Sequence, residues 1–148
     1  MYIPTPHYKA IVEVLPILCV DLLIIHNSRC LLLKRTNEPA LGQYWFPGGR
    51  VRKNESIAEA AIRISKAETG LDCIFKEQVS VEETMFEKAA NMDSDVHTVN
   101  ICCTMEVVST LDCLKPDRFH DDFKWVDKLS GDFHDGVKHP LSKIGFGY

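Results

Sequence analysis

The chain contains 148 residues, of which 45% are hydrophobic and 26% are charged. This length and composition predict a single globular domain over residues 1–148 and exclude a disordered, collagen-like or low-complexity chain. The 17 basic residues are outnumbered by 21 acidic ones, which gives a net charge of −4. Because the chain has no overall positive field, we expect it to bind neither nucleic acid nor an acidic membrane surface.

The cysteines and the most apolar N-terminal stretch both bear on the location of the protein. None of the six cysteines forms a C-x-x-C pair, so we expect reduced core thiols rather than a zinc site. The stretch 14–25 is short for a membrane span and contains Pro16 and Asp21. We therefore expect a cytoplasmic protein without a signal peptide or a membrane anchor.

The first elements that the sequence predicts are strands. Branched apolar residues fill 17–25 and 30–35, and a polar turn separates these two runs. Residues 36–42 are predicted as a loop, and 44–46 as a short strand that ends at the turn of Pro47, Gly48 and Gly49.

A helix is predicted next, because Asn54 or Ser56 can cap its start and Gly70 can follow its end after Thr69. Glu68 falls on the same helical face as the apolar residues, so we expect a buried carboxylate that needs a cation or hydrogen bonds. The alternative is that Glu68 bends to water from the last turn or pairs with an arginine. The apolar residues of this face are Ile57, Ala60, Ala61, Ile64 and Ala67.

Beyond the helix, residues 73–85, 96–108 and 123–126 are predicted as strands, with loops at 91–95 and 115–117. A short helix fits near the C-terminus. The element order β-β-β-α-β-β-β indicates an α/β fold in which a helix packs on a mixed sheet.

Arginines gather around the glycine-rich turn. Arg35 ends the second predicted strand, and Arg50 and Arg52 lie one and three residues after Gly49. Guanidinium groups beside a glycine-rich turn and an acid suit a diphosphate and a divalent cation. The alternative is that these arginines are solvated charges at strand edges, and that Arg63 forms a surface salt bridge with Glu59.

The residues from the turn to the end of the helix resemble the Nudix box, GX5EX7REUXEEXGU, in which U is an aliphatic residue. The matching positions are Gly49, Glu55, Arg63, Glu68, Gly70 and Leu71. The resemblance implies the Nudix α/β/α sandwich, with a mixed β-sheet and the box on a loop-helix-loop. Typical members cut a diphosphate at phosphorus with two or more Mg²⁺ ions on a cluster of acids.

Two acids of that cluster are replaced here, by Ile64 and Ala67, which leaves Glu68. The resemblance therefore implies one Mg²⁺, with Mn²⁺ as an alternative, held by Glu68 and the Gly48 carbonyl. The same replacements resemble the GDP-mannose mannosyl hydrolase branch, as do segments 34–40, 44–51 and 116–125. Enzymes of this branch cleave at the sugar C1 with inversion and release GDP and free hexose.

This branch implies a nucleotide-sugar substrate, GDP-mannose or GDP-glucose, and a homodimer. It implies that His120 is the general base, with Asp121 or Asp122 orienting or stabilising the ring. It also implies that Arg35 and Arg50 are catalytic, by taking the charge of the leaving diphosphate, and that Asp21 is a further polar catalytic residue. Arg63 joins the two other arginines in binding the substrate. Two positions depart from the branch: Phe119 replaces a glutamine that binds the metal, and Asn100 lies where an aromatic hydroxyl is expected.

Two other functions fit the same sequence. In the first, the chain is a nucleoside-diphosphate-X pyrophosphohydrolase that attacks phosphorus and rebuilds its metal site with Glu82, Glu83 or Glu87. A solvated strand edge is the alternative explanation of these glutamates. In the second, the chain is a Nudix-fold module that binds a nucleotide without cutting it.

Overall fold

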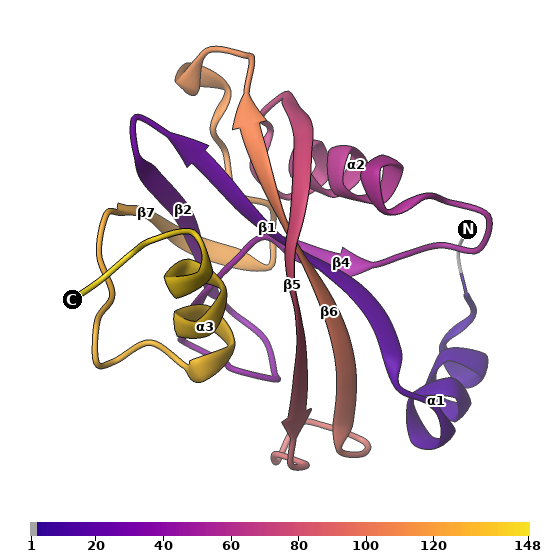
Figure 1. The fold of residues 1–148 in the computed structure, drawn as a ribbon. Coiled ribbons are helices and arrows are strands. Elements are labelled where there is room, and N and C mark those ends of the chain that lie inside the picture. The colour runs from indigo at the N-terminus through magenta and orange to yellow at the C-terminus, as the bar shows by residue number, and fades with distance from the viewer. Residues whose placement is uncertain (1–2) are drawn as a thin grey trace.

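The computed structural model describes residues 3–148, whose strands form one mixed sheet with the helices around it (Figure 1). The helices are α1 (Thr5–Val14), α2 (Ile57–Thr69) and α3 (Asp135–Lys143), with a short 3-10 turn, η1 (Leu111–Cys113). The strands are β1 (Ile17–His26), β2 (Arg29–Arg35), β3 (Tyr44–Trp45), β4 (Gly48–Arg50), β5 (Cys73–Phe86), β6 (Val96–Val107) and β7 (His120–Val126).

The sheet has seven strands in the order β3-β2-β1-β6-β5, with β4 paired to β1 and β7 paired to β2. β1 and β6 run parallel, whereas the other pairs are antiparallel. Strand residues alternate between the two faces of a sheet. Accordingly, Val20, Leu22 and Ile24 of β1 pack in the core beside α2, while Leu23 packs in the core that contains Val137 and Leu141 of α3.

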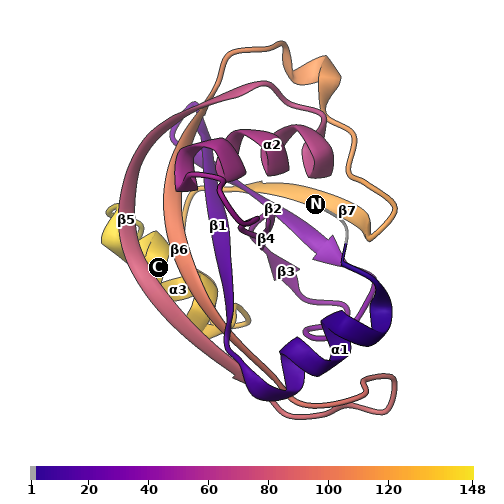
Figure 2. The ribbon, with the colours of Figure 1, turned by 90° about the vertical axis from the view of Figure 1, so that its right-hand side faces the viewer.

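The two helices therefore cover opposite faces of the curved sheet, which confirms the predicted α/β/α sandwich (Figure 2). Of the described helices, none is both long and apolar enough to span a bilayer.

The predicted boundaries of α2 are confirmed by its two ends. Ser56 and Glu59 form a capping box at the start, and Gly70 adopts φ +75° at the end, a conformation that glycine tolerates best. The predicted apolar face is wrong at Ala67, which is exposed. Ser65 and Thr69 are buried instead, since their hydroxyls donate to the backbone carbonyls of Ala61 and Ser65.

Two further elements differ from the prediction. The N-terminal helix α1 was not expected, and none of its residues is buried, so it carries no strong apolar signal. The glycine-rich turn does not end the strand structure, because residues 48–50 form β4 and pair with β1.

The divergence of β1 and β2 creates the space for a site. These strands pair directly only at Ile25 with Cys30 and at His26 with Arg29. Further along, β4 lies beside β1 and β3 lies beside β2, so the chain crosses between them at Pro47. Gly48 approaches β1 so closely that a Cβ atom there would lie 2.5 Å from Oδ1 of Asp21. The crossing therefore requires glycine at this position.

Candidate active site

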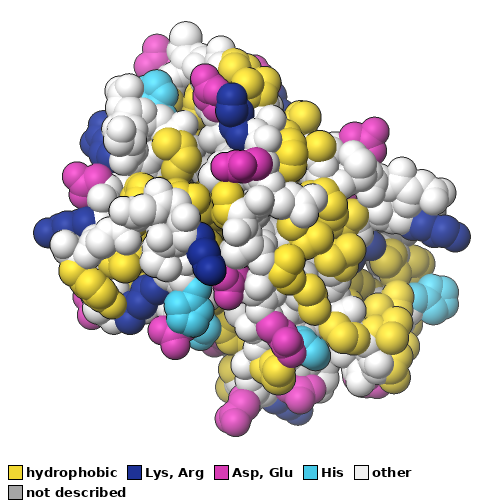
Figure 3. All heavy atoms as spheres, in the orientation of Figure 1, with side chains coloured by type: hydrophobic (Ala, Val, Ile, Leu, Met, Phe, Trp, Pro, Cys, Tyr) yellow, Lys and Arg dark blue, Asp and Glu magenta, His cyan; other side chains and the backbone are white. Residues whose placement is uncertain are grey.

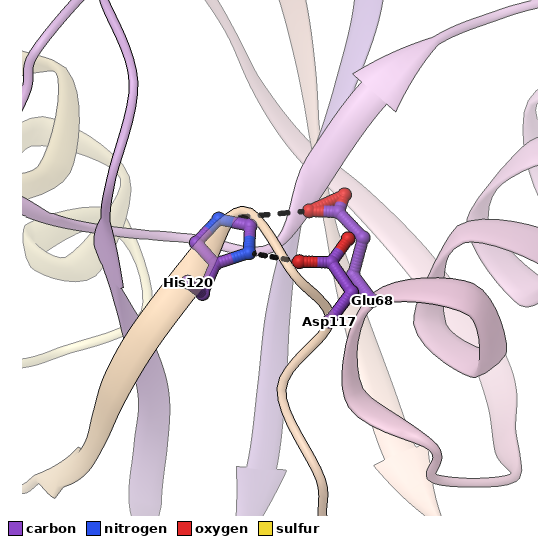
Figure 4. A group of neighbouring side chains, drawn as sticks. All are labelled: Glu68, Asp117 and His120. Atoms are coloured by element: carbon purple, nitrogen blue, oxygen red, sulfur yellow. Dashed lines mark hydrogen bonds and ion pairs between the residues drawn. The ribbon is translucent and has the colours of Figure 1, made fainter.

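Three side chains converge where α2 ends and β7 begins: Glu68, Asp117 and His120 (Figure 4). The Nδ1 atom of His120 lies 2.7 Å from Oδ1 of Asp117, and its Nε2 atom lies 3.9 Å from Oε1 of Glu68. The imidazole is only 5% exposed and the Glu68 side chain 15%. The ring is thus held between two carboxylates in a largely desolvated place.

Backbone hydrogen bonds fix this arrangement. The amides of Lys115 and Asp117 donate to the carbonyls of Thr69 and Glu68, at 2.8 Å and 3.0 Å, so the loop before β7 is tied to the last turn of α2. Oδ1 of Asp117 also accepts the Phe119 amide at 3.1 Å, which folds the loop back onto His120. The geometry therefore follows from the main chain and not from mobile side chains alone.

Glu68 confirms the expectation of a buried acid on the helix. Burial and the nearby Asp117 carboxylate raise its pKa to about 8, while the Gly48 amide, 3.4 Å away, and Arg35 act in the opposite direction. Two carboxylates placed this close together favour a bound cation, since positive charge relieves both their repulsion and the cost of burial.

The chemistry of these donors fits a divalent metal. One ligand atom from each of Glu68, Asp117 and His120 lies within 4.8 Å of the others. Carboxylate oxygens suit Mg²⁺ and Mn²⁺, and an imidazole nitrogen is accepted by transition metals. Gly48 lies beside this cluster, since its amide donates to Oε1 of Glu68, and the role of its carbonyl as a metal ligand stays a prediction.

Arg35 lies between this cluster and a second acid, Asp21. Burial lowers the pKa of its guanidinium, and the charges of Glu68 and Asp21 oppose that shift. Its Nε donates to the Pro39 carbonyl at 2.7 Å, and Nη2 donates to Oδ1 of Asn37 at 3.2 Å. The guanidinium is therefore held in place at the centre of the site.

Asp21 points from β1 toward a pocket of about 210 Å³ that Arg35 and Gly48 also line. Its Oδ2 accepts hydrogen bonds from the Asn100 amide at 3.2 Å and the Trp45 indole at 3.5 Å. Burial nevertheless raises the pKa of this carboxyl to about 6. The acid in the apolar strand is therefore buried, hydrogen-bonded and adjacent to a cavity.

The remaining predicted arginines lie around the same loop. The Arg50 guanidinium lies 5.8 Å from the centre of the Tyr8 ring, and the Arg52 side chain is exposed. Arg63 donates two hydrogen bonds to the carboxylate of Glu55, of 2.7 Å and 2.9 Å, and a third to the Arg50 carbonyl. Its partner is thus Glu55, whereas the weighed alternative of a pair with Glu59 is wrong, since Glu59 caps the helix.

The expected partners of His120 require a correction. Asp121 and Asp122 do not contact the imidazole; Asp121 is exposed, and Asp122 accepts a hydrogen bond from Tyr44. The partner is Asp117, which sequence reasoning missed. Successive residues on a strand point to opposite faces, whereas the turn from Asp117 to His120 brings these two side chains together.

The glutamates considered for a rebuilt metal site lie outside the cluster of Glu68, Asp117 and His120, although Glu82 is close enough to Asp21 for its charge to raise the pKa of that carboxyl. Glu82 and Glu83 face His139 and His97, and Glu87 lines a different pocket beside α1. Within residues 3–148, the group suited to a metal contains none of these three.

Comparison with known proteins identifies the family. The model of the NUDIX domain matches residues 16–130, so the chain belongs to the Nudix hydrolase family. It is 33% identical over 146 residues to the low-salt glycan biosynthesis protein Agl8 of Haloferax volcanii, a match that covers 96% of this chain and 90% of that protein.

A second relative, the ADP-ribose pyrophosphatase of Methanocaldococcus jannaschii, is 32% identical over 93 residues, which cover 63% of this chain and 52% of that protein. Among solved structures, a MutT NUDIX hydrolase from Burkholderia pseudomallei superposes with a TM-score of 0.66 at 21% identity, covering 87% of this chain and 98% of that one. A NUDIX hydrolase from Nitrosomonas europaea gives 0.67 at 17% identity, covering 85% and 68%. These structures share the fold.

Proposed function

We propose that this chain is a divalent-metal-dependent hydrolase that cleaves GDP-mannose or GDP-glucose to GDP and free hexose, with water attacking the sugar C1 and inverting it. The observation that carries the proposal is the pair of Asp117 and His120 beside Glu68. A buried imidazole oriented by a carboxylate is suited to remove a proton from water. Two acids of the Nudix box are replaced by Ile64 and by the exposed Ala67. Their loss fits attack at the sugar carbon, because that reaction does not need several metal ions bound at phosphorus.

The proposed mechanism assigns a step to each residue. Asp117 accepts a hydrogen bond from Nδ1–H of His120, which leaves the lone pair of Nε2 free to take a proton from water, and its charge stabilises the resulting imidazolium. Arg35 and Arg50 neutralise the departing diphosphate. Asp21 accepts a hydrogen bond from the substrate. A divalent cation at Glu68 and Asp117 would supply further positive charge for the leaving group.

Products of hydrolysis test this proposal. The protein is incubated with Mg²⁺ and GDP-mannose or GDP-glucose, and the nucleotides are separated by ion exchange. We expect GDP and hexose, and about 10²–10⁴-fold slower turnover in His120→Gln with nearly unchanged affinity. His139→Gln, which changes an exposed histidine outside the site, is the matched control. Equal turnover in both variants removes His120 from the mechanism.

A second function is supported by the metal-binding geometry. If Glu68, Asp117 and His120 all bind divalent cations, Asp117 and His120 take the place of the two acids that the box has lost. The enzyme would then be a pyrophosphohydrolase, in which water attacks phosphorus. The relative in Methanocaldococcus jannaschii carries the name of such an enzyme. The products then are a nucleoside monophosphate and a hexose phosphate. Tight binding without any product supports a nucleotide-binding module instead.

The proposal includes a homodimer in the cytoplasm. β5 is an edge strand, and Ile74, Val81 and Met85 on it are exposed, which favours a partner. Figure 3 shows hydrophobic side chains gathered on the face of the molecule that carries β5 and β6. The free cysteines suit a reducing compartment. Light scattering that gives twice the monomer mass supports the dimer, and cell fractionation tests the location.

A further inference from the structure

A row of hydrogen-bonded side chains lines the pocket beside Asp21. Thr84 of β5 pairs across the sheet with Thr98 of β6, and Asn100 lies two residues further along the same face of β6. Oδ1 of Asn100 accepts from the Thr98 hydroxyl at 2.6 Å and from the Thr84 hydroxyl at 3.3 Å. Its amide then donates to Oδ2 of Asp21. We call these four residues the polar row.

The burial of the polar row requires an explanation. Asp21, Thr84 and Asn100 are 5%, 6% and 7% exposed, although all three line the pocket. Burying polar groups in the middle of a sheet costs free energy that apolar side chains would avoid. The bonds within the row recover part of this cost, and a bound ligand can recover the rest.

The atoms that the row leaves for a ligand are mainly acceptors. Both hydrogen bonds to Asp21 end on Oδ2, and within residues 3–148 no donor reaches Oδ1. The hydroxyls of Thr84 and Thr98 donate their hydrogen bonds to other atoms of the row, so towards the pocket they can only accept hydrogen bonds. A ligand that donates hydrogen bonds therefore fits this wall, whereas one with acceptors at the same points does not.

Aromatic rings form part of the remaining lining of the pocket, together with Arg35 and several small or aliphatic residues. Trp45 and Phe86 line it with ring centroids 5.8 Å apart, and Tyr8 of α1 lies at its edge. Such walls, combined with a few placed polar atoms, are typical of sites that hold a ring with an apolar face and a polar rim.

We propose that the polar row determines specificity, by accepting hydrogen bonds from donor groups on a ring of the substrate and so rejecting rings that lack them. A site built to bond a donor discriminates strongly, because its buried polar atoms are unpaired when the donor is missing. The inference rests on the proposed function, because it assumes that the bound ring belongs to a nucleotide sugar. Hexose hydroxyls and guanine N–H groups have the same donor chemistry.

The test uses Thr84→Val and Thr98→Val, which keep the shape and the branched side chain but lose the hydroxyl. Thr104→Val on β6, outside the pocket, is the matched control. Calorimetry with EDTA, so that no hydrolysis occurs, gives the Kd for GDP-mannose, for deoxy-sugar analogues and for IDP-mannose, which lacks the amino group of guanine. Thermal unfolding confirms that each variant is folded.

We expect the wild type and Thr104→Val to prefer GDP-mannose over one kind of analogue by about 5- to 10-fold, and both pocket variants to lose that preference. Loss of discrimination against a deoxy sugar assigns the ring to the hexose, and loss against IDP-mannose assigns it to the base. A wild type that does not discriminate, or pocket variants that weaken all ligands equally, overturns the inference. The proposed function is tested by a separate experiment, the identification of the products formed with Mg²⁺, so its failure is distinguished from failure of this inference.

Discussion

Asp117 and His120 are joined by a 2.7 Å contact between Oδ1 and Nδ1, and the same oxygen accepts the backbone amide of Phe119. An ionised Asp117 therefore keeps a proton on Nδ1 and directs the lone pair of Nε2 toward Glu68. The ring is thereby set in one tautomer before any substrate binds. The loop that carries these residues is tied to the end of α2, so the base and the box acid form one unit.

Replacing Asp117 tests this orientation. Asp117→Asn preserves the shape but removes the charge, so we expect kcat to fall by about 10²-fold or more, with a smaller change in KM. Asp121→Asn, at an exposed position that does not contact the ring, should retain wild-type kcat. Steady-state kinetics on both variants gives the comparison, and similar values of kcat exclude the role given to Asp117.

The raised pKa of Glu68 predicts how stability depends on pH. The folded state holds a proton up to about pH 8, whereas the unfolded state loses it near the ordinary value of 4.5. The folded state thus binds more protons in this interval, and stability falls as pH rises from 4.5 to 8. Asp21 has the same effect between pH 3.8 and about 6, so the effect of Glu68 between pH 6 and 8 no longer overlaps that of Asp21, and a comparison with Glu68→Gln separates it from the other groups that titrate there.

Urea unfolding of the metal-free protein at pH 6 and pH 8 measures this effect. The wild type should lose stability across the interval more steeply than Glu68→Gln, whose side chain does not titrate. Mg²⁺ should stabilise the wild type more at pH 8.5 than at pH 6.5, because the cation binds the carboxylate form. Parallel curves for the two proteins contradict a buried, proton-binding Glu68.

Arg63 tests whether the box arginine supports the loop. Arg63→Ala removes two hydrogen bonds to Glu55 and one to the Arg50 carbonyl, so we expect the free energy of unfolding to fall by about 1–3 kcal/mol. Lys53→Ala, at an exposed position in the same loop, should change stability by less than about 0.5 kcal/mol. Normal stability in Arg63→Ala, combined with a large rise in KM, favours direct substrate contact instead.

Gly48 tests the close approach of the crossing chain to β1. In Gly48→Ala the new Cβ would lie 2.5 Å from Oδ1 of Asp21 and 2.6 Å from the Val20 carbonyl. Both strands must shift, and we expect a loss of about 1–3 kcal/mol in stability together with reduced activity. Gly131→Ala, whose Cβ meets no atom within 4 Å, is the control. An unchanged melting temperature in Gly48→Ala contradicts this packing.

Local signals in the sequence predicted much of the fold. The capping residues Ser56 and Gly70 fixed the ends of α2, and continuous apolar runs marked β1 and β2. α1 escaped prediction because it buries no residue. β4 also escaped, since its pairing depends on Asp21 and Gly48 meeting across the sheet, which no local pattern encodes.

The site divides in the same way. Glu68 stood out because a charged residue on the apolar face of a helix is visible from helical spacing alone. Asp117 did not, because its contact with His120 depends on a turn and on the attachment of that turn to α2. The polar row depends on the register that sets Thr84 opposite Thr98, and a register between distant strands follows from the whole sheet.

The position of bond cleavage tests the central claim most directly. ³¹P NMR is recorded on the products formed from GDP-mannose or GDP-glucose with Mg²⁺ in ¹⁸O-enriched water. Attack at the sugar carbon predicts GDP without the heavy isotope and ¹⁸O in the released hexose. GMP and hexose phosphate, with ¹⁸O on phosphorus, would contradict the account and support the pyrophosphohydrolase.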